Sequence, residues 1–396
     1  MDQKFIQRVG HVLSYGSRQM ILILGNALVA LLVVRYASDA VWGQFVKIFV
    51  VVTLIANILT WGNRDYLLRG FAENPNQVDT QFGRSLKSRT VLLVIGALVL
   101  CLVLTSANRY WAIIWLIAQF THQSLEVFII YHRRFVVSAL VEGMGLVVIL
   151  VGCLVFQISA SFLTQLFALS FVLRTVALIL FLPPTFWSGI HIKVPNYWSF
   201  FKDAKWFFLI GLSGLLQSRI DLYIVSFFLE DVEVGRYQIM ISLLILVQTI
   251  SGFIMTPFSI NLMRQSQEKM QVIAGKMSWL GILISSLGVC FSFYLLQVLY
   301  RFDFPAVYYL LGFLLVFPIF TYLSWIYFLY GINLEQKVMK WNFVGALTNM
   351  ILTILLIPSL GIMGALLSSA FVQCGLAIVF PIIVRNLDKG SRTISR

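Results

Sequence analysis

Long apolar stretches separated by short polar ones run along the whole chain. A helix needs about 20 apolar residues to cross the roughly 30 Å hydrocarbon layer of a membrane. Helices are expected because lipid offers no partner to an unpaired backbone group. The pattern therefore predicts about 12 transmembrane helices, of which the third and eleventh are short. They are residues 14–34, 41–61, 90–107, 110–131, 135–156, 162–182, 206–229, 237–255, 279–298, 306–327, 341–357 and 362–384.

The composition agrees with this pattern. Of the 396 residues, 60% are hydrophobic and only 11% are charged, whereas soluble domains have about 25% charged residues. This balance excludes a typical soluble enzyme, a disordered chain and a secreted disulfide scaffold. The four cysteines all lie within apolar stretches and have no metal-binding or redox spacing. We therefore predict an all-α polytopic membrane protein.

The basic residues predict the orientation of this protein in the membrane. If the N-terminus is inside, 22 of the 29 Lys and Arg fall in inside segments and 4 in outside loops. Inside loops of membrane proteins carry an excess of Lys and Arg. We therefore expect both termini to be cytoplasmic. The net charge of +13 then needs no nucleic acid to explain it.

A proline-containing segment separates the predicted helices into two groups of six. It contains Pro183, Pro184 and Pro195. The predicted organisation is an N-terminal lobe at 1–184, a cytoplasmic linker at 185–205 and a C-terminal lobe at 206–396.

A weak internal repeat supports this division. A shift of 192 residues places Asp39 and Gly43 on Asp231 and Gly235, between the first two spans of each half. We interpret both places as tight external turns, in which the acid caps the next helix and the glycine lets the backbone turn.

Charged side chains inside the spans are the main candidates for function. Each costs at least about 2.5–3.5 kcal/mol at the bilayer centre, so each should face protein or a water-filled cavity. Glu142 and Arg174 lie at similar depths on consecutive spans, which predicts an ion pair that is either structural or cavity-lining. His122 and Glu126 share one helix face. They either join helices or couple protons, because histidine titrates near neutral pH.

Other polar residues lie nearer the membrane centre or at its inner edge. Arg219 and Asp221 are two residues apart and should project from different faces of their helix. Lys47 either snorkels outward or reaches the cavity. Arg64 either follows the inside-positive rule or captures an anionic headgroup. Asn26 and Asn57 are polar candidates in the first two spans. We expect most of the abundant aromatic side chains to face lipid or neighbouring helices rather than sugar.

The sequence contains no recognised catalytic or nucleotide-binding motif. A P-loop, an HExxH helix, a paired CxxC and a glycine-rich dinucleotide loop are all absent from it. No predicted external loop is long enough to build an active site. We therefore expect no enzyme activity, no catalytic residue, no metal and no cofactor.

Four stretches resemble the polysaccharide-transporter family, the O-antigen-unit flippases of the multidrug/oligosaccharidyl-lipid/polysaccharide exporter superfamily. One is the turn element from Arg35 to Phe45, and another is the sequence WGNRDYLLR at 61–69. The third is Ile220-Asp221 with VGRY at 234–237. The most specific one runs from Asn349 through LIPSLGIMGA at 356–365. The chain departs from the family in having bulky Ile48 and Met240 after the turn elements.

This resemblance implies a function and a set of site residues. Two six-helix lobes would enclose a cavity and translocate undecaprenyl-diphosphate-linked oligosaccharide units across the bacterial inner membrane by alternating access. Surrounding lipids and a polysaccharide polymerase are the implied partners. The candidate cavity residues are Asn26, Lys47, Asn57, Arg64, Arg174, Arg219 and Asp221. The candidate residues for coupling to H⁺ or Na⁺ are His122, Glu126, Glu142 and Asp221.

The sequence leaves the driving force and two rival functions open. The drive is either an ion gradient or the membrane potential acting on an anionic substrate. One rival is a multidrug/cation antiporter of the same superfamily, which would favour an acidic cavity. The intramembrane acids and bases are equal in number, at three each, and so do not favour it. The other rival is a membrane-embedded glycan-processing enzyme.

Overall fold

The computed structural model describes residues 24–104, 106–132, 134–181, 197–332 and 334–394, and these contain no strand. Eleven of their helices are long and apolar enough to cross a membrane, and a shorter apolar helix covers Leu24–Tyr36. The predicted all-helical, polytopic membrane fold is therefore confirmed. The start of the predicted first span, before residue 24, lies outside the described residues.

Contacts within the chain divide the described residues into two compact units. The first unit extends to Leu212 and the second begins at Ser213. Long helix α9 (Tyr197–Phe228) contributes to both units. Only part of the predicted linker at 185–205 is described, and from Tyr197 that part is helical.

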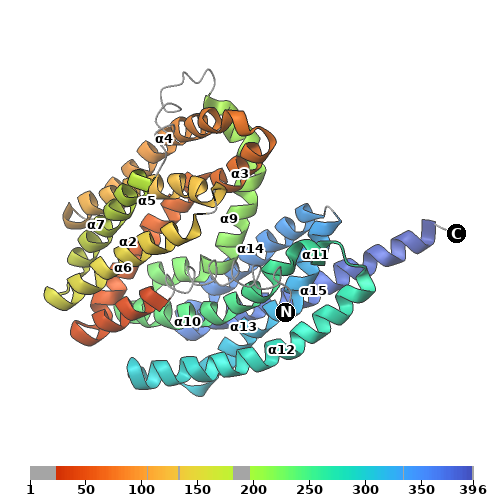
Figure 1. Cartoon of the computed structure of the whole chain (residues 1–396). Helices are drawn as coiled ribbons and strands as arrows, with labels where there is room; N and C mark the ends of the chain where they lie inside the picture. The colour runs from red at the N-terminus through yellow and green to blue at the C-terminus, as the bar shows by residue number, and fades with distance from the viewer. Residues whose placement is uncertain (1–23, 105, 133, 182–196, 333, 395–396) are drawn as a thin grey trace, which may run out of the picture. The chain divides into compact units, whose positions relative to one another are not determined.

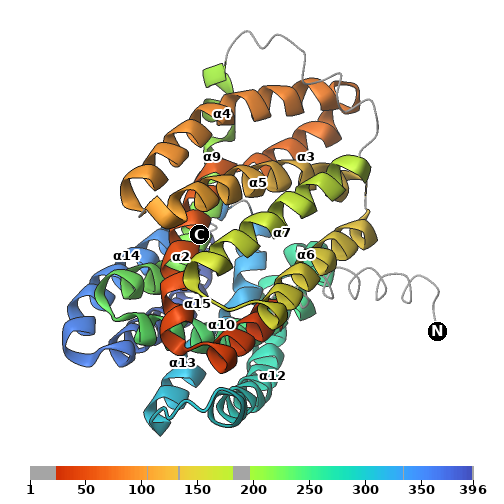
Figure 2. The same ribbon diagram turned by 90° about the vertical axis from the view of Figure 1, so that its left-hand side faces the viewer.

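The first unit is built around helices α5 and α7, which lie side by side (Figures 1 and 2). Helix α2 packs against both of them, and α6 packs against α7. Phe45, Trp115 and Phe167 form an aromatic core between these helices, with the Phe45 and Trp115 rings nearly parallel at 6.1 Å. The helices of this unit before α9 are α2 (Asp39–Thr60), α3 (Asn63–Glu73), α4 (Val78–Val103), α5 (Ser106–Tyr131), α6 (Phe135–Val155) and α7 (Ala160–Phe181).

The polar segment between the predicted second and third spans is mostly helical, in α3 and the start of α4. Trp61 and Gly62 both adopt positive φ and end α2 sharply. Helix α3 follows and turns one apolar face, with Leu67 and Phe71, toward Phe82 and Phe128. A helix with one apolar face is stable at such a packed site even though the segment is too polar to span a membrane.

Arg89 is completely buried, although its position suggested a cytoplasmic loop residue. Its guanidinium donates to Ser124 Oγ at 2.9 Å and to Ser85 Oγ at 3.2 Å. It also lies over the Phe120 ring, with 5.0 Å between the guanidinium carbon and the ring centroid. These contacts join α4 to α5 and compensate the desolvation of the charge.

The two repeated glycines lie within helices, which corrects their predicted role in turns. Gly43 is in α2 and Gly235 in α10 (Asp231–Met255), and both are buried. Ser38 caps α2 by accepting a hydrogen bond from Val41 N at 3.2 Å. Asp39 and Asp231 occupy the first helical turns, where a negative charge is favourable next to the exposed N–H groups.

The second unit is centred on α13, which packs against α12 and α15, while α14 packs against α15. Its helices after α9 are α10 (Asp231–Met255), α11 (Ser259–Met263), α12 (Gln267–Tyr294), α13 (Ala306–Gly331), α14 (Glu335–Leu360) and α15 (Ile362–Ile394).

The connection between α14 and α15 requires two glycines. Gly361 has φ of +55° and ends α14. A Cβ on Gly364 would lie 2.7 Å from the Leu356 carbonyl carbon and oxygen. This Gly-x-x-Gly sequence thus lets the backbone of α15 approach that of α14 closely.

We expect Gly364→Ala to destabilise the protein by about 1–3 kcal/mol, because the methyl group would overlap backbone. Thermal unfolding of the purified protein in detergent measures this. Gly375→Ala on the same helix is the matched control, since a Cβ there meets no atom within 4 Å. Equal melting temperatures for the two variants would contradict the packing described here.

Candidate functional site

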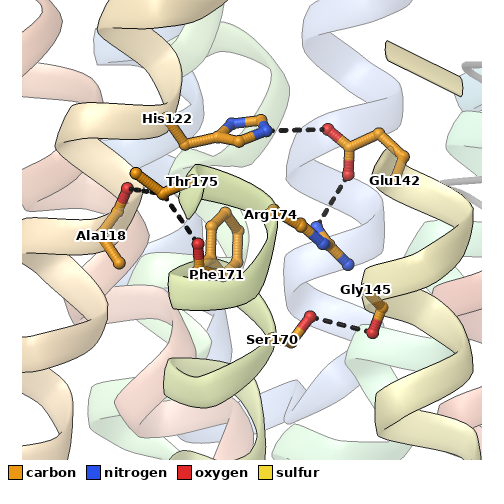
Figure 3. Close-up of polar contacts among 8 residues, drawn as sticks. All are labelled: Ala118, His122, Glu142, Gly145, Ser170, Phe171, Arg174 and Thr175. Atoms are coloured by element: carbon orange, nitrogen blue, oxygen red, sulfur yellow. Dashed lines mark hydrogen bonds and ion pairs between the residues drawn. The ribbon is translucent and has the colours of Figure 1, made fainter. Parts of the chain in front are cut away.

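A buried ion pair and a histidine lie at the centre of the first unit. Arg174 Nη1 on α7 lies 2.8 Å from Glu142 Oε2 on α6, and His122 Nε2 on α5 lies 3.5 Å from Glu142 Oε1. Figure 3 shows both side chains reaching the same carboxylate from different helices. The predicted pairing of Glu142 with Arg174 is therefore confirmed.

Small residues and local hydrogen bonds hold this group in place. Gly145 leaves room for Arg174, since a Cβ on Gly145 would overlap the arginine side chain. Ser170 Oγ donates to the Gly145 carbonyl at 2.9 Å, and Thr175 Oγ1 donates to the Ala118 carbonyl at 2.9 Å (Figure 3). Helix α7 is thus tied to both α6 and α5, which fixes the positions of the charged groups.

The ion pair borders a cavity of about 160 Å³ in the first unit. Two predicted cavity residues, Asn26 and Arg174, line it, as does the predicted coupling residue Glu142. Four aromatic side chains also line it. The lining residues are Asn26, Phe49, Thr53, Trp115, Gln119, Glu142, Leu146, Phe167, Phe171 and Arg174.

Three of the lining residues carry buried polar atoms that have no hydrogen-bond partner among the described residues. They are Trp115 Nε1, Gln119 Oε1 and Arg174 Nε. Buried polar groups in native proteins usually have a partner. This cavity therefore has the composition of a binding site for a polar ligand.

A second polar cluster surrounds Asp221 in the second unit. Asp221 Oδ2 accepts hydrogen bonds from Tyr237 Oη and, at 3.0 Å, from Ser369 Oγ. Its Oδ1 accepts from Leu222 N at 2.8 Å. Asn349 Nδ2 donates to Ser369 Oγ at 3.2 Å, so α9, α10, α14 and α15 all contribute to the cluster. All of these side chains are buried.

The Asp221 cluster borders its own cavity, of about 140 Å³. Gln248 Nε2 donates to the Leu315 carbonyl at 2.8 Å, and Tyr322 Oη donates to Gln373 Oε1 at 2.7 Å, along its wall. The polar residues that line it are Gln217, Ser218, Asp221, Gln248, Tyr322, Asn349, Ser369 and Gln373.

The other predicted site residues lie outside these two cavity linings. Lys47 and Asn57 are partly buried on α2, and Arg64 is exposed at the start of α3. Glu126 is partly buried on α5, one turn beyond His122. Arg219 is partly buried, does not line the Asp221 cavity and forms no ion pair within the described part of the chain.

Some residues of these sites were missed from the sequence. Trp115, Gln119, His122 and Glu126 follow one another at helical spacing on α5, so a polar stripe could have revealed Gln119. Asn349 and Tyr237 stand out in the sequence only as parts of the family-like stretches, and Ser369 carries no sequence signal of its own.

Comparison with solved structures identifies the fold. The chain is similar to an inward closed conformation of the lipid II flippase MurJ, with TM-score 0.66 and 12% identity over 94% of this chain and 87% of that one. It is also similar to an inward-facing multidrug resistance MATE transporter of the MOP superfamily, with TM-score 0.65 and 13% identity over 97% of this chain and all of the other.

A third similar structure is the MATE multidrug transporter DinF-BH, with TM-score 0.60 and 13% identity over 96% of this chain and 94% of that one. No family model and no curated protein matches the sequence. The chain therefore has the fold of these MurJ and MATE structures. At this level of identity the likeness shows the fold alone.

Proposed function

We propose that the protein translocates undecaprenyl-diphosphate-linked oligosaccharide units across the bacterial inner membrane, for O-antigen or other surface polysaccharide synthesis. Transporters with this fold include a lipid II flippase and multidrug exporters, so substrate charge has to discriminate between them. The observation that carries the proposal is that Glu142, the one acid that lines the first cavity, is already paired with a cation. Its Oε2 lies 2.8 Å from Arg174 Nη1.

This arrangement argues against the cation exporter. A buried cationic drug needs a carboxylate that is not already paired with another cation, because a buried charge is costly without a partner of opposite charge. In the first cavity Arg174 already pairs with the carboxylate of Glu142, at 2.8 Å. The glycan-processing enzyme has no support beyond the membrane fold. Multidrug export stays the second candidate because of the MATE likeness.

The proposed mechanism is alternating access. The glycan enters a hydrated cavity while the polyprenyl tail stays in lipid, and the two lobes then rock so that the cavity opens outward. Arg64, Lys47 and Arg219 offset the desolvation of the diphosphate by charge-assisted hydrogen bonds. A polysaccharide polymerase would take the unit on the outer face.

The drive is either an ion gradient or the membrane potential, and Asp221 is our first choice for the coupling group. Its cluster combines the Asp221 carboxylate on α9 with two hydroxyls, from α10 and α15, and one amide, from α14. Such a cluster binds either a proton or a small cation such as Na⁺. His122, Glu126 and Glu142 form the second group that could carry a proton.

The leaflet location of the lipid-linked glycan tests the proposal. Oriented vesicles from cells that lack the protein are probed with an impermeant glycan-binding reagent. We expect accumulation on the cytoplasmic face, and return to the outer face on complementation. An intermediate that stays unpolymerised on the outer face would favour the enzyme, and an unchanged distribution would favour drug export.

Charge reversal tests the diphosphate contacts. We expect Lys47→Glu and Arg219→Glu each to lower transport about 10- to 100-fold, because each removes a charge-assisted contact of about 1.5–3 kcal/mol and adds repulsion. Lys276→Glu is the control, since Lys276 is exposed in the first half of α12. Uptake into vesicles at equal protein level is the measurement. Unaffected transport in both variants rules out these two contacts.

A further inference from the structure

The cavity of the first unit has no net charge. Its one acid and its one base, Glu142 and Arg174, lie 2.8 Å apart and neutralise each other. A diphosphate would have to compete with Glu142 for the arginine, and a cation would have to compete with Arg174 for the carboxylate. A neutral ligand avoids both costs.

Three of the residues that line this cavity carry hydrogen-bonding atoms that lack partners among the described residues. Trp115 Nε1 and Arg174 Nε are donors, and Gln119 Oε1 is an acceptor. A ligand that carries hydroxyl groups can both accept and donate, so its chemistry suits a set of two donors and one acceptor. A purely apolar ligand would leave these buried groups unsatisfied.

The same cavity presents four aromatic side chains. The rings of Trp115 and Phe171 are stacked, with centroids 6.0 Å apart and planes 29° apart. The Phe49 and Phe167 rings lie 5.9 and 5.3 Å from the Trp115 ring. Flat aromatic faces with a few placed polar groups are typical of small-molecule sites. A ring with C–H groups on its faces and hydroxyls on its edge matches this combination.

We propose that this cavity binds one neutral sugar ring of the translocated glycan. The proposal rests on the function proposed above and adds a residue-level site to it. The ring lies against the aromatic side chains, and its hydroxyls bond to Gln119 and to the outer edge of the Glu142–Arg174 pair. The diphosphate is bound elsewhere, by the cationic groups proposed above to contact it.

Binding of the free glycan tests this site without requiring transport. The probe is the oligosaccharide unit released by mild acid from the lipid-linked intermediate of the host cell. Titration calorimetry is performed on the full chain in detergent. We expect one unit to bind per chain, and Gln119→Met to weaken binding about tenfold or more, since it removes a buried polar partner at nearly equal volume.

Gln123→Met is the matched control. Gln123 lies one turn further on α5, also has a buried Oε1 without a partner among the described residues, and does not line the cavity. We expect it to bind as the wild type does. We expect Thr53→Phe to abolish binding, because the new side chain fills the cavity from α2. It is the second variant to measure if Gln119→Met folds poorly.

Competition distinguishes the sugar from other ligands. Pyrophosphate and a planar cationic dye should not displace the oligosaccharide, because the cavity is neutral. The proposal would be overturned if either compound displaced the oligosaccharide or if Gln119→Met bound it as tightly as the wild type. Absence of any binding would also overturn it and would mean that the cavity holds water only. Leaflet location of the lipid-linked glycan is measured separately, so a failure of the flippase function remains distinguishable.

Discussion

Arg174→Met alone is expected to destabilise the protein by about 3–5 kcal/mol, because it leaves the buried Glu142 carboxylate without its cation. His122 Nε2 lies 3.5 Å from Glu142 Oε1, so the histidine replaces only part of the lost interaction. The double variant Glu142→Leu/Arg174→Met should recover most of this loss, since no uncompensated charge remains. Chemical or thermal unfolding in one detergent measures both.

The exposed pair Arg69–Glu73 provides the control. Its atoms are also 2.8 Å apart, but both side chains are more than half exposed on α3. Arg69→Met should therefore change the melting temperature little. If the double variant is as unstable as the single one, packing against Gly145 and Phe171 rather than charge compensation explains the role of Arg174.

The features that the sequence predicted correctly are those with a single dominant physical cause. The thickness of the hydrocarbon layer sets the length of a spanning helix, so the apolar stretches revealed the spans. The high cost of an isolated intramembrane charge made a partner for Glu142 necessary. Arg174 was the nearest base at the same depth, and the two do form an ion pair.

The features that the sequence did not reveal depend on distant residues. Arg89 can be buried because Ser124, 35 residues away on α5, accepts a hydrogen bond from its guanidinium and so compensates part of the desolvation cost. Ser369, which donates to Asp221, is 148 residues away. The orientation was predicted from the number of Lys and Arg on each side of the membrane. That count does not distinguish a buried arginine from an exposed one, because both add to the excess on the inner side.

Aromatic residues raise the same problem for the candidate site. Phe49, Trp115 and Phe167 lie on three different helices, and each fits the apolar pattern of its own helix whether it faces lipid, core or a cavity. Only the packing of α2, α5 and α7 brings them around one space. The neutrality of this cavity likewise depends on the 2.8 Å contact between Glu142 and Arg174, which the sequence does not reveal.

Asp221→Asn is expected to abolish gradient-driven transport. The substitution removes the negative charge at nearly equal size, and the new amide cannot accept from both Tyr237 Oη and Ser369 Oγ if its nitrogen faces them. A gradient of 100 mV supplies about 2.3 kcal/mol per coupled charge, which corresponds to roughly 40-fold accumulation. The variant should lose this accumulation while still exchanging substrate without a gradient.

Proteoliposomes measure this, with a pH gradient and a Na⁺ gradient imposed in separate experiments. Wild-type protein should respond to one of them, which identifies the ion, and Asp221→Asn should respond to neither. Asp303→Asn is the control, because Asp303 is exposed between α12 and α13. If Asp221→Asn keeps the full response, coupling belongs to the His122–Glu142 group of the first unit. If the wild type responds only to an imposed potential, the charge of the substrate supplies the drive, and the Asp221 cluster then serves to join α9, α10, α14 and α15.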